Sequence, residues 1–263
     1  VAFFDDFSWR SFVALNWPAA EGVRGEPDRG KQLGANAKNV VWGTWKADHE
    51  IFQPGGMEPS EWNSFQGQSP DPFTPFGDAG KVKVLGGFGV RGSDLQIEHY
   101  NQANQVGLEQ GSLVSRNRKY VRYEVRINRR EFDFIRSGKF YLGNAIDEEV
   151  KRKGQLVFPE GSTEIKAAWR LFTSEEMQNQ AIIDRYYRAS AVLVSPGGER
   201  TEATVGLIGL HIVRRTQSRP EWIWSTFEHI DNDAGANSTL AVSQDPNRNN
   251  WNKLRPVVNP ARP

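Results

Sequence analysis

The sequence has no cysteine and only two methionines among its 263 residues. The absence of cysteine excludes disulfide bonds, thiolate metal ligands, a cysteine nucleophile and covalent attachment of c-type haem to this chain. No run approaches the roughly 20 apolar residues of a membrane-spanning helix, and no hydrophobic signal segment is present. The 33 basic residues nearly balance the 32 acidic ones, so no strong overall field favours nucleic acid as a partner. We therefore expect neither a membrane span nor a nucleic-acid ligand.

The length fits one large domain that is able to bury a substantial core. We expect a single domain over residues 1–263, with a helical and loop portion up to about residue 80. A β-rich portion should follow over residues 81–230, and an extended tail over residues 231–263. Residues 53–80 are dense in proline, glycine, serine and aspartate, which predicts a long ordered loop. Because the chain starts at Val1, we expect a processed or truncated N-terminus.

The order of the predicted elements favours an α+β fold. Amphipathic spacing predicts a helix over residues 5–17, ended by Pro18, and a second helix over residues 40–52. From residue 81 onwards the pattern is that of strands, with a short helix over 129–136 that Asn128 begins. The strands are expected over residues 81–85, 119–127, 164–170, 186–194, 205–215 and 221–231. We predict a mainly antiparallel or barrel-like sheet with N-terminal helices and long loops.

Three of these strands have one polar and one apolar face, over residues 164–170, 205–215 and 221–231. The last two carry the only closely spaced histidines of the chain, His211 and His229. Because successive side chains of a strand point to opposite faces, Lys166 and Arg170 share a face, whereas Glu228 and His229 are separated. Either Glu228 or His229 can lie opposite His211 on a neighbouring strand. We expect these strands to form the functional site.

The residue types at this site suggest two kinds of chemistry. Neutral imidazoles with a carboxylate bind copper, iron or zinc, so a transition-metal site would use His211 and His229. The same groups act as general acid and base. If the protein is an enzyme, we expect its catalytic residues to be Lys166, Arg170, His211 and Glu228.

The same residues also have purely structural interpretations. A histidine in an apolar strand is more often a buried hydrogen-bonding residue than a ligand, and Glu228 can form a structural salt bridge with Arg170 or Lys166. Regular alternation places Leu207 on the face of His211. Gly206 and Gly209 indicate a bulge or the close approach of an aromatic ring, most naturally that of Trp222 or Trp224. These two tryptophans are either core residues or a platform for a flat ligand.

Two long segments carry a resemblance to a known family. Residues 206–216, GLIGLHIVRRT, and residues 219–232, RPEWIWSTFEHIDN, resemble a signature of an uncharacterised family of exported bacterial proteins. Residues 8–18 and 158–170 are similar to two other blocks of that family, in matching order. The family is sometimes described as cytochrome-c-related, because some members contain haem-attachment motifs. This chain has no Cys-x-x-Cys-His motif, so it is not itself a c-type cytochrome.

The resemblance implies a periplasmic or extracellular location and a redox neighbourhood, with a c-type cytochrome as partner. We therefore consider a redox-linked or metal-dependent enzyme with a polar pocket on the sheet. The alternative is a non-catalytic protein that binds a saccharide or another small ligand in a groove formed by Trp222 and Trp224. A structural subunit of an exported complex is a third hypothesis, for which an exposed apolar patch would be the indication.

Overall fold

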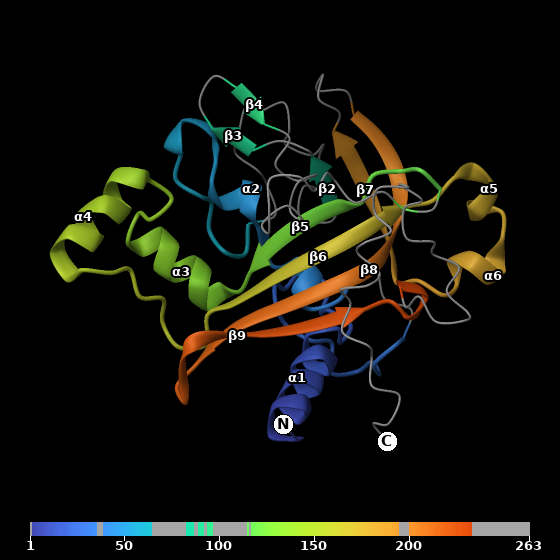
Figure 1. Cartoon of the computed structure of the whole chain (residues 1–263), viewed down its shortest axis with the longest axis horizontal. Helices are drawn as coiled ribbons and strands as arrows, with labels where there is room; N and C mark the ends of the chain where they lie inside the picture. The colour runs from blue at the N-terminus through green and yellow to red at the C-terminus, as the bar shows by residue number, and fades with distance from the viewer. Residues whose placement is uncertain are drawn as a thin grey trace, which may run out of the picture.

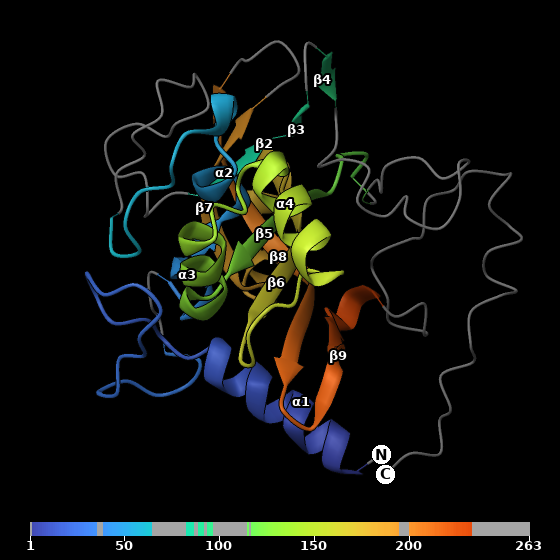
Figure 2. The same cartoon turned by 90° about the vertical axis from the view of Figure 1, so that its left-hand side faces the viewer.

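The computed structural model describes residues 2–35, 39–64, 83–86, 89–91, 94–96, 115, 117–194 and 200–232 (Figures 1 and 2). The α-helices are α1 (Ala2–Leu15), α2 (Asp48–Ile51), α3 (Arg129–Ser137), α4 (Gly143–Lys153), α5 (Ser174–Met177) and α6 (Gln180–Ile183). Short 3₁₀ helices are η1 (Trp42–Thr44), η2 (Pro54–Gly56) and η4 (Ile230–Asn232). The strands are β1 (Lys46–Ala47), β2 (Lys83–Gly86), β3 (Gly89–Arg91), β4 (Asp94–Gln96), β5 (Arg122–Ile127), β6 (Thr163–Leu171), β7 (Arg188–Val194), β8 (Arg200–Thr216) and β9 (Arg219–Glu228). Residues 65–80 of the predicted loop and the tail from residue 233 lie outside the described residues.

One curled sheet dominates the fold. Its strand order is β1-β5-β6-β8-β7-β2, and β9 pairs with β8 as a seventh strand. The long strand β8 has β6 on one side, and on its other side it pairs first with β7 and then with β9. All pairs in this sheet are antiparallel except β2 with β7. The predicted α+β fold with a mainly antiparallel, barrel-like sheet is confirmed, because the sheet curls into a half-barrel (Figure 2).

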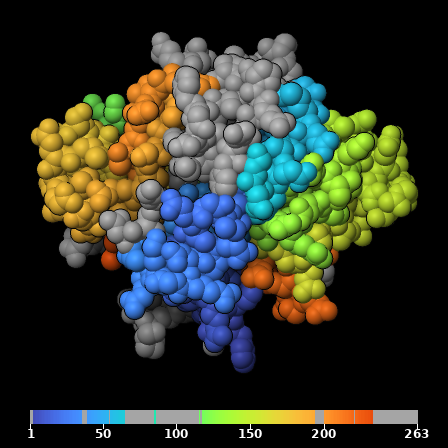
Figure 3. Space-filling view, turned by 180° about the vertical axis from the view of Figure 1, so that it is seen from behind, coloured from blue at the N-terminus to red at the C-terminus, as the bar shows by residue number. Residues whose placement is uncertain are grey.

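The two faces of the sheet differ in what covers them. We call the face that carries Ile165, Trp169 and Ile212 the core face, and each of these side chains is at most 2% exposed. The N-terminal residues 2–35 and 39–64 cover this face, as the view from behind shows (Figure 3). We call the opposite face, which carries Lys166 and His211, the front face, and it is turned towards the viewer in Figure 1.

The N-terminal segment confirms one predicted helix and contradicts the other. The helix over residues 5–17 is present as α1, which ends three residues before Pro18. The helix over residues 40–52 is wrong, since this segment forms η1, β1 and the single turn of α2. Its residues Val40, Val41, Trp42 and Trp45 are all buried. An amphipathic surface helix needs one polar face, which residues that are buried on every side do not provide.

Strand β5 turns its charged side chains towards the core. Glu124 and Arg126 are 3% and 5% exposed, and Arg126 donates to the Glu124 carboxylate at 2.9 Å. Arg126 also donates to the Trp45 carbonyl at 2.6 Å. Burial of Glu124 and Arg126 is tolerated because each of these two charges has a hydrogen-bonding partner.

A bulge at Ile208 changes the phase of β8. Ala168 of β6 lies opposite Gly209, but the next residue, Trp169, lies opposite Leu207. Ile208 is the extra residue, so Leu207 lies on the core face with Trp169. The predicted position of Leu207 beside His211 is wrong for this reason.

Gly206 is required by a close aromatic contact. A Cβ atom at Gly206 would lie 2.7 Å from Cζ of Phe172 and 3.1 Å from Cβ of Tyr186. The prediction of a ring next to this glycine is correct, but the expectation that the ring belongs to Trp222 or Trp224 is wrong.

The helices between the strands follow local signals. Asn128 caps α3, as predicted, by accepting a hydrogen bond from the Glu131 amide at 3.1 Å, and Gly138 ends the helix. Helices α4, α5 and α6 were not predicted. None of the helices in the described parts of the chain combines the length and the apolar character that crossing a bilayer would need.

Candidate functional site

Strand register creates a polar row across the front face. Lys166 of β6 lies directly opposite His211 of β8, and His211 lies opposite Thr226 of β9. Nδ1 of His211 and Oγ1 of Thr226 are 2.8 Å apart. Lys166 and His211 are half-buried, whereas Thr226 is exposed. Two of the predicted site residues are therefore neighbours, and Thr226 joins them as a partner that the sequence analysis did not consider.

The two tryptophans of β9 have different environments. Trp224 is 56% exposed, and its indole meets the His211 ring edge to face, with centroids 6.1 Å apart. Trp222 is half-buried and packs against Phe158, with ring centroids 5.6 Å apart. Of the two predicted ligand-binding residues, only Trp224 lies open beside the polar row.

A second row of side chains lies next to the polar row. Its members are two small residues, Ala168 of β6 and Gly209 of β8, followed by the exposed Glu228 of β9. Glu228 forms no ion pair with Arg170, Lys166 or any other residue in the described parts of the chain. The structural salt bridge considered for Glu228 is thus not formed, and its carboxylate stays open to solvent.

Arg170 belongs to a different cluster. It is 4% exposed, forms an ion pair with Glu176 and donates to the Tyr186 hydroxyl at 2.9 Å. Its guanidinium also lies over the Phe172 ring, 5.0 Å from the centroid. These contacts give Arg170 a structural environment, and none of them involves Lys166 or His211.

His229 is also separate from His211. Its ring stacks on Tyr186 with centroids 4.1 Å apart. Its Nε2 donates to the Arg185 carbonyl at 2.9 Å, and its Nδ1 accepts from the Asp231 amide at 3.1 Å. Both ring nitrogens are therefore engaged in hydrogen bonds. Within the described residues no group of three or more His, Asp or Glu side chains has an arrangement that could hold a metal ion, and we propose no metal site here.

Burial moves the titratable groups of the front face towards their neutral forms. The pKa of His211 is lowered by burial and by the nearby Lys166 charge, and Glu228 opposes this shift. Burial also lowers the pKa of Lys166, against the influence of Glu164. For Glu164, burial raises the carboxyl pKa. The side chains of the row can act as hydrogen-bond donors and acceptors, and burial favours their uncharged forms.

Glu131 is a buried acid that the sequence analysis missed. It lies in the first turn of α3, is 4% exposed, and its Oε2 has no hydrogen-bond partner. Burial and the neighbouring Glu164 raise its pKa to about 8. The only sequence signal was its position three residues after the cap Asn128, which predicts a surface residue rather than a buried one.

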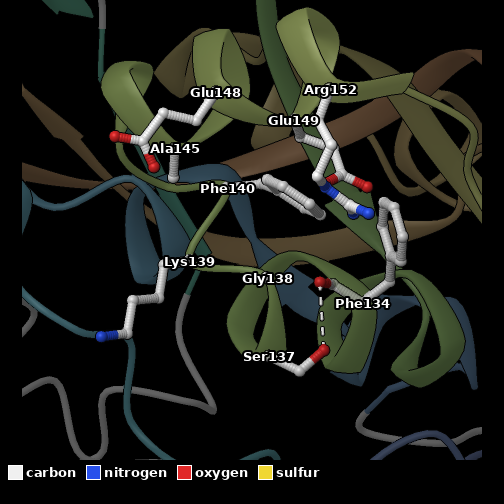
Figure 4. A pocket seen from close by; sticks show the side chains of 9 residues that line it. All are labelled: Phe134, Ser137, Gly138, Lys139, Phe140, Ala145, Glu148, Glu149 and Arg152. Carbon is white, nitrogen blue, oxygen red and sulfur yellow. Dashed lines mark hydrogen bonds and ion pairs between the residues drawn. The ribbon is translucent and has the colours of Figure 1, made fainter. Parts of the chain in front are cut away.

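A hollow of about 520 Å³ lies between α3 and α4, away from the polar row (Figure 4). Phe134 and Phe140 form its apolar wall, with ring centroids 5.0 Å apart. Glu149 is paired with Arg152 and Lys153. None of the predicted site residues lines this hollow, and its charges largely compensate one another.

Comparison of the chain with protein-family models, with curated proteins and with solved structures found no match. The family resemblance carried by residues 206–216 and 219–232 stays a prediction.

Proposed function

We propose that the protein binds a small, neutral, polyhydroxylated ligand such as a saccharide on the front face of the sheet. The observation that carries this proposal is the 56% exposed indole of Trp224 beside the row of Lys166, His211 and Thr226. An exposed aromatic ring supplies an apolar surface for the flat side of a ligand. The adjoining polar side chains supply orientation through hydrogen bonds.

The charge state of the row supports a neutral ligand. His211 has a lowered pKa, and Lys166 and Glu164 are both displaced by burial towards their uncharged forms. Lys166 and Glu228 act on His211 with charges of opposite sign, so the row favours neither an anionic nor a cationic ligand. Hydroxyl groups act as both donors and acceptors, so they suit a surface of this mixed kind.

Calorimetric titration of the full chain with a panel of neutral mono- and oligosaccharides tests the proposal. Trp224→Ala should weaken binding by about tenfold or more, which corresponds to about 1.4 kcal/mol. Phe52→Ala is the matched control, since Phe52 is 53% exposed and lies outside the row. If no sugar binds, or if both variants bind like the unaltered protein, the proposal fails.

An acid–base enzyme is a second candidate, favoured by the environment of His211. Its Nδ1 is held by Thr226 at 2.8 Å, which leaves Nε2 as the ring nitrogen that faces a ligand. A half-buried imidazole with one fixed nitrogen is suited to proton transfer. Conversion of a bound saccharide that His211→Ala abolishes, without loss of binding, would favour the enzyme over the binding protein.

The family resemblance alone supports two further parts of the proposal. These are a location outside the cytoplasm and a c-type cytochrome as partner. Fractionation of producing cells tests the location, and recovery of the protein with the cytoplasmic fraction would contradict it.

A further inference from the structure

In the described parts of the chain, strand β9 is paired along one edge only, with β8. The amide of His229 donates to the Ile208 carbonyl at 3.0 Å, and backbone groups alternate in direction along an antiparallel strand. The odd-numbered residues from 223 to 227 therefore bond to β8. The N–H and C=O groups of Trp222, Trp224, Thr226 and Glu228 point outward, and in the described parts of the chain they have no backbone partner.

Within the residues that the structure describes, the central part of this edge lacks the usual protection against strand addition. Proteins blunt edge strands with short length, charged side chains, proline or a covering element. Residues 222–227 read Trp-Ile-Trp-Ser-Thr-Phe and contain neither a charge nor a proline. The charges Glu221 and Glu228 stand only at the two ends of this stretch.

Helix α1 provides an apolar ledge next to the same edge. Oγ of Ser8 and Oγ of Ser225 are 2.8 Å apart, and Trp9 packs on Phe227 with ring centroids 5.1 Å apart. The N-terminal end of α1 projects beyond β9 (Figure 1). Along α1, the apolar side chains of Phe3, Phe4, Trp9 and Val13 are 93%, 46%, 59% and 37% exposed.

We propose that the β9 edge takes up an extended segment of a partner protein as an additional strand of the sheet. The outward backbone groups of β9 would supply the main-chain hydrogen bonds, and the α1 ledge would receive every second side chain of the segment. The carboxylate of Glu228, at the end of this edge, has no ion pair among the described residues. The segment should therefore alternate apolar with polar residues and carry lysine or arginine among the polar ones.

A second copy of this chain fits the edge less well than a separate segment. Pairing of two β9 strands about a two-fold axis would place the centre of each strand next to the other. Because Ser8 of α1 is bonded to Ser225 at the middle of β9, both copies of α1 would then need the same space beneath the joined strands. A peptide without such a helix meets no such obstacle.

The test uses a displayed library of ten-residue peptides with an apolar residue at every second position and Ser, Thr, Lys or Arg between. Selection on the full chain should enrich peptides that contain basic residues. Addition of a selected peptide should slow amide hydrogen exchange at Trp222, Trp224, Thr226 and Glu228 by at least about tenfold, because an opening cost of about 1.4 kcal/mol is added.

Two controls separate strand addition from unspecific adhesion. N-methylation of the peptide amides that face β9 should weaken binding by about tenfold or more, whereas N-methylation of the alternate amides should leave it unchanged. Because this control alters only the peptide, protein folding is unaffected. A Phe3→Ser, Trp9→Ser variant should also bind less tightly. Failure to enrich any peptide, equal effects of the two methylation patterns, or self-association through β9 in sedimentation experiments would each overturn the proposal.

Discussion

Nε1 of Trp169 donates a 3.1 Å hydrogen bond to the carboxylate of Glu124 in the interior of the protein. The same carboxylate accepts from Arg126 at 2.9 Å. One acidic group thus satisfies an indole and neutralises a guanidinium, and all three side chains are at most 5% exposed. This arrangement explains how the core face of β5 tolerates charge.

Glu124→Ala should lower the free energy of unfolding by about 3–5 kcal/mol, because it leaves the Arg126 charge buried without its partner. Urea denaturation measures the effect. Asp133→Ala, which removes the partner of Arg129 in an exposed pair, should cost less than about 1 kcal/mol. Similar small losses in both variants would contradict the buried network.

Gly206→Ala should destabilise the protein, whereas Gly209→Ala in the same strand should be tolerated. A Cβ atom at position 206 would lie 2.7 Å from the Phe172 ring, but one at position 209 would lie 3.5 Å from Ala168, which is an ordinary contact. Overpacking of this kind costs about 1–3 kcal/mol. Thermal unfolding of both variants checks the difference, and an equal change in Tm would refute it.

The free energy of unfolding should fall as pH rises from the ordinary range of a glutamate towards about 8, the raised pKa of Glu131. A carboxyl group whose pKa is higher in the folded state binds more protons there than in the unfolded state, so deprotonation favours unfolding. Glu131→Gln should remove this part of the pH dependence and stabilise the protein most at alkaline pH. Glu148→Gln, at an exposed position of α4, should leave the pH profile as it is. A profile unchanged by Glu131→Gln would exclude a raised pKa.

The pKa of His211 should respond in opposite directions to its two charged neighbours. Lys166→Ala should raise it, because a nearby positive charge disfavours the imidazolium, and Glu228→Gln should lower it, because a favourable negative charge is lost. NMR titration of the imidazole resonances measures both shifts. A His211 pKa that neither substitution changes would mean that the three groups are not neighbours in solution.

Alternation along the chain was sufficient to predict β2, the strands β5 to β9 and part of the site, but not the short strands β1, β3 and β4. Lys166 and His211 were expected on polar faces of adjacent strands, and the register places them directly opposite each other. Asn128 was correctly expected to cap α3, since capping depends on neighbouring residues only.

The predictions that were wrong concern residues whose partners come from distant segments of the chain. Arg170 was grouped with Lys166 because both lie on one face of a strand, but Glu176 and Tyr186, from a segment between β6 and β7, bind its guanidinium. His229 was paired with His211 by proximity in sequence, yet Arg185 and Tyr186 hold its ring. Periodicity describes a residue's direction within its own strand and contains no information about such partners.

The extra residue in β8 gives this strand one position that tolerates a change in length. Deletion of Ile208 would make Leu207 and Gly209 consecutive, as their partners Trp169 and Ala168 already are on β6. The core and front faces would then alternate without interruption, and each remaining side chain would keep its face. A deletion within residues 210–213 would instead move the side chains on one side of it to the opposite face of a strand that contacts three others. We therefore expect natural length variation within β8 to be confined to position 208.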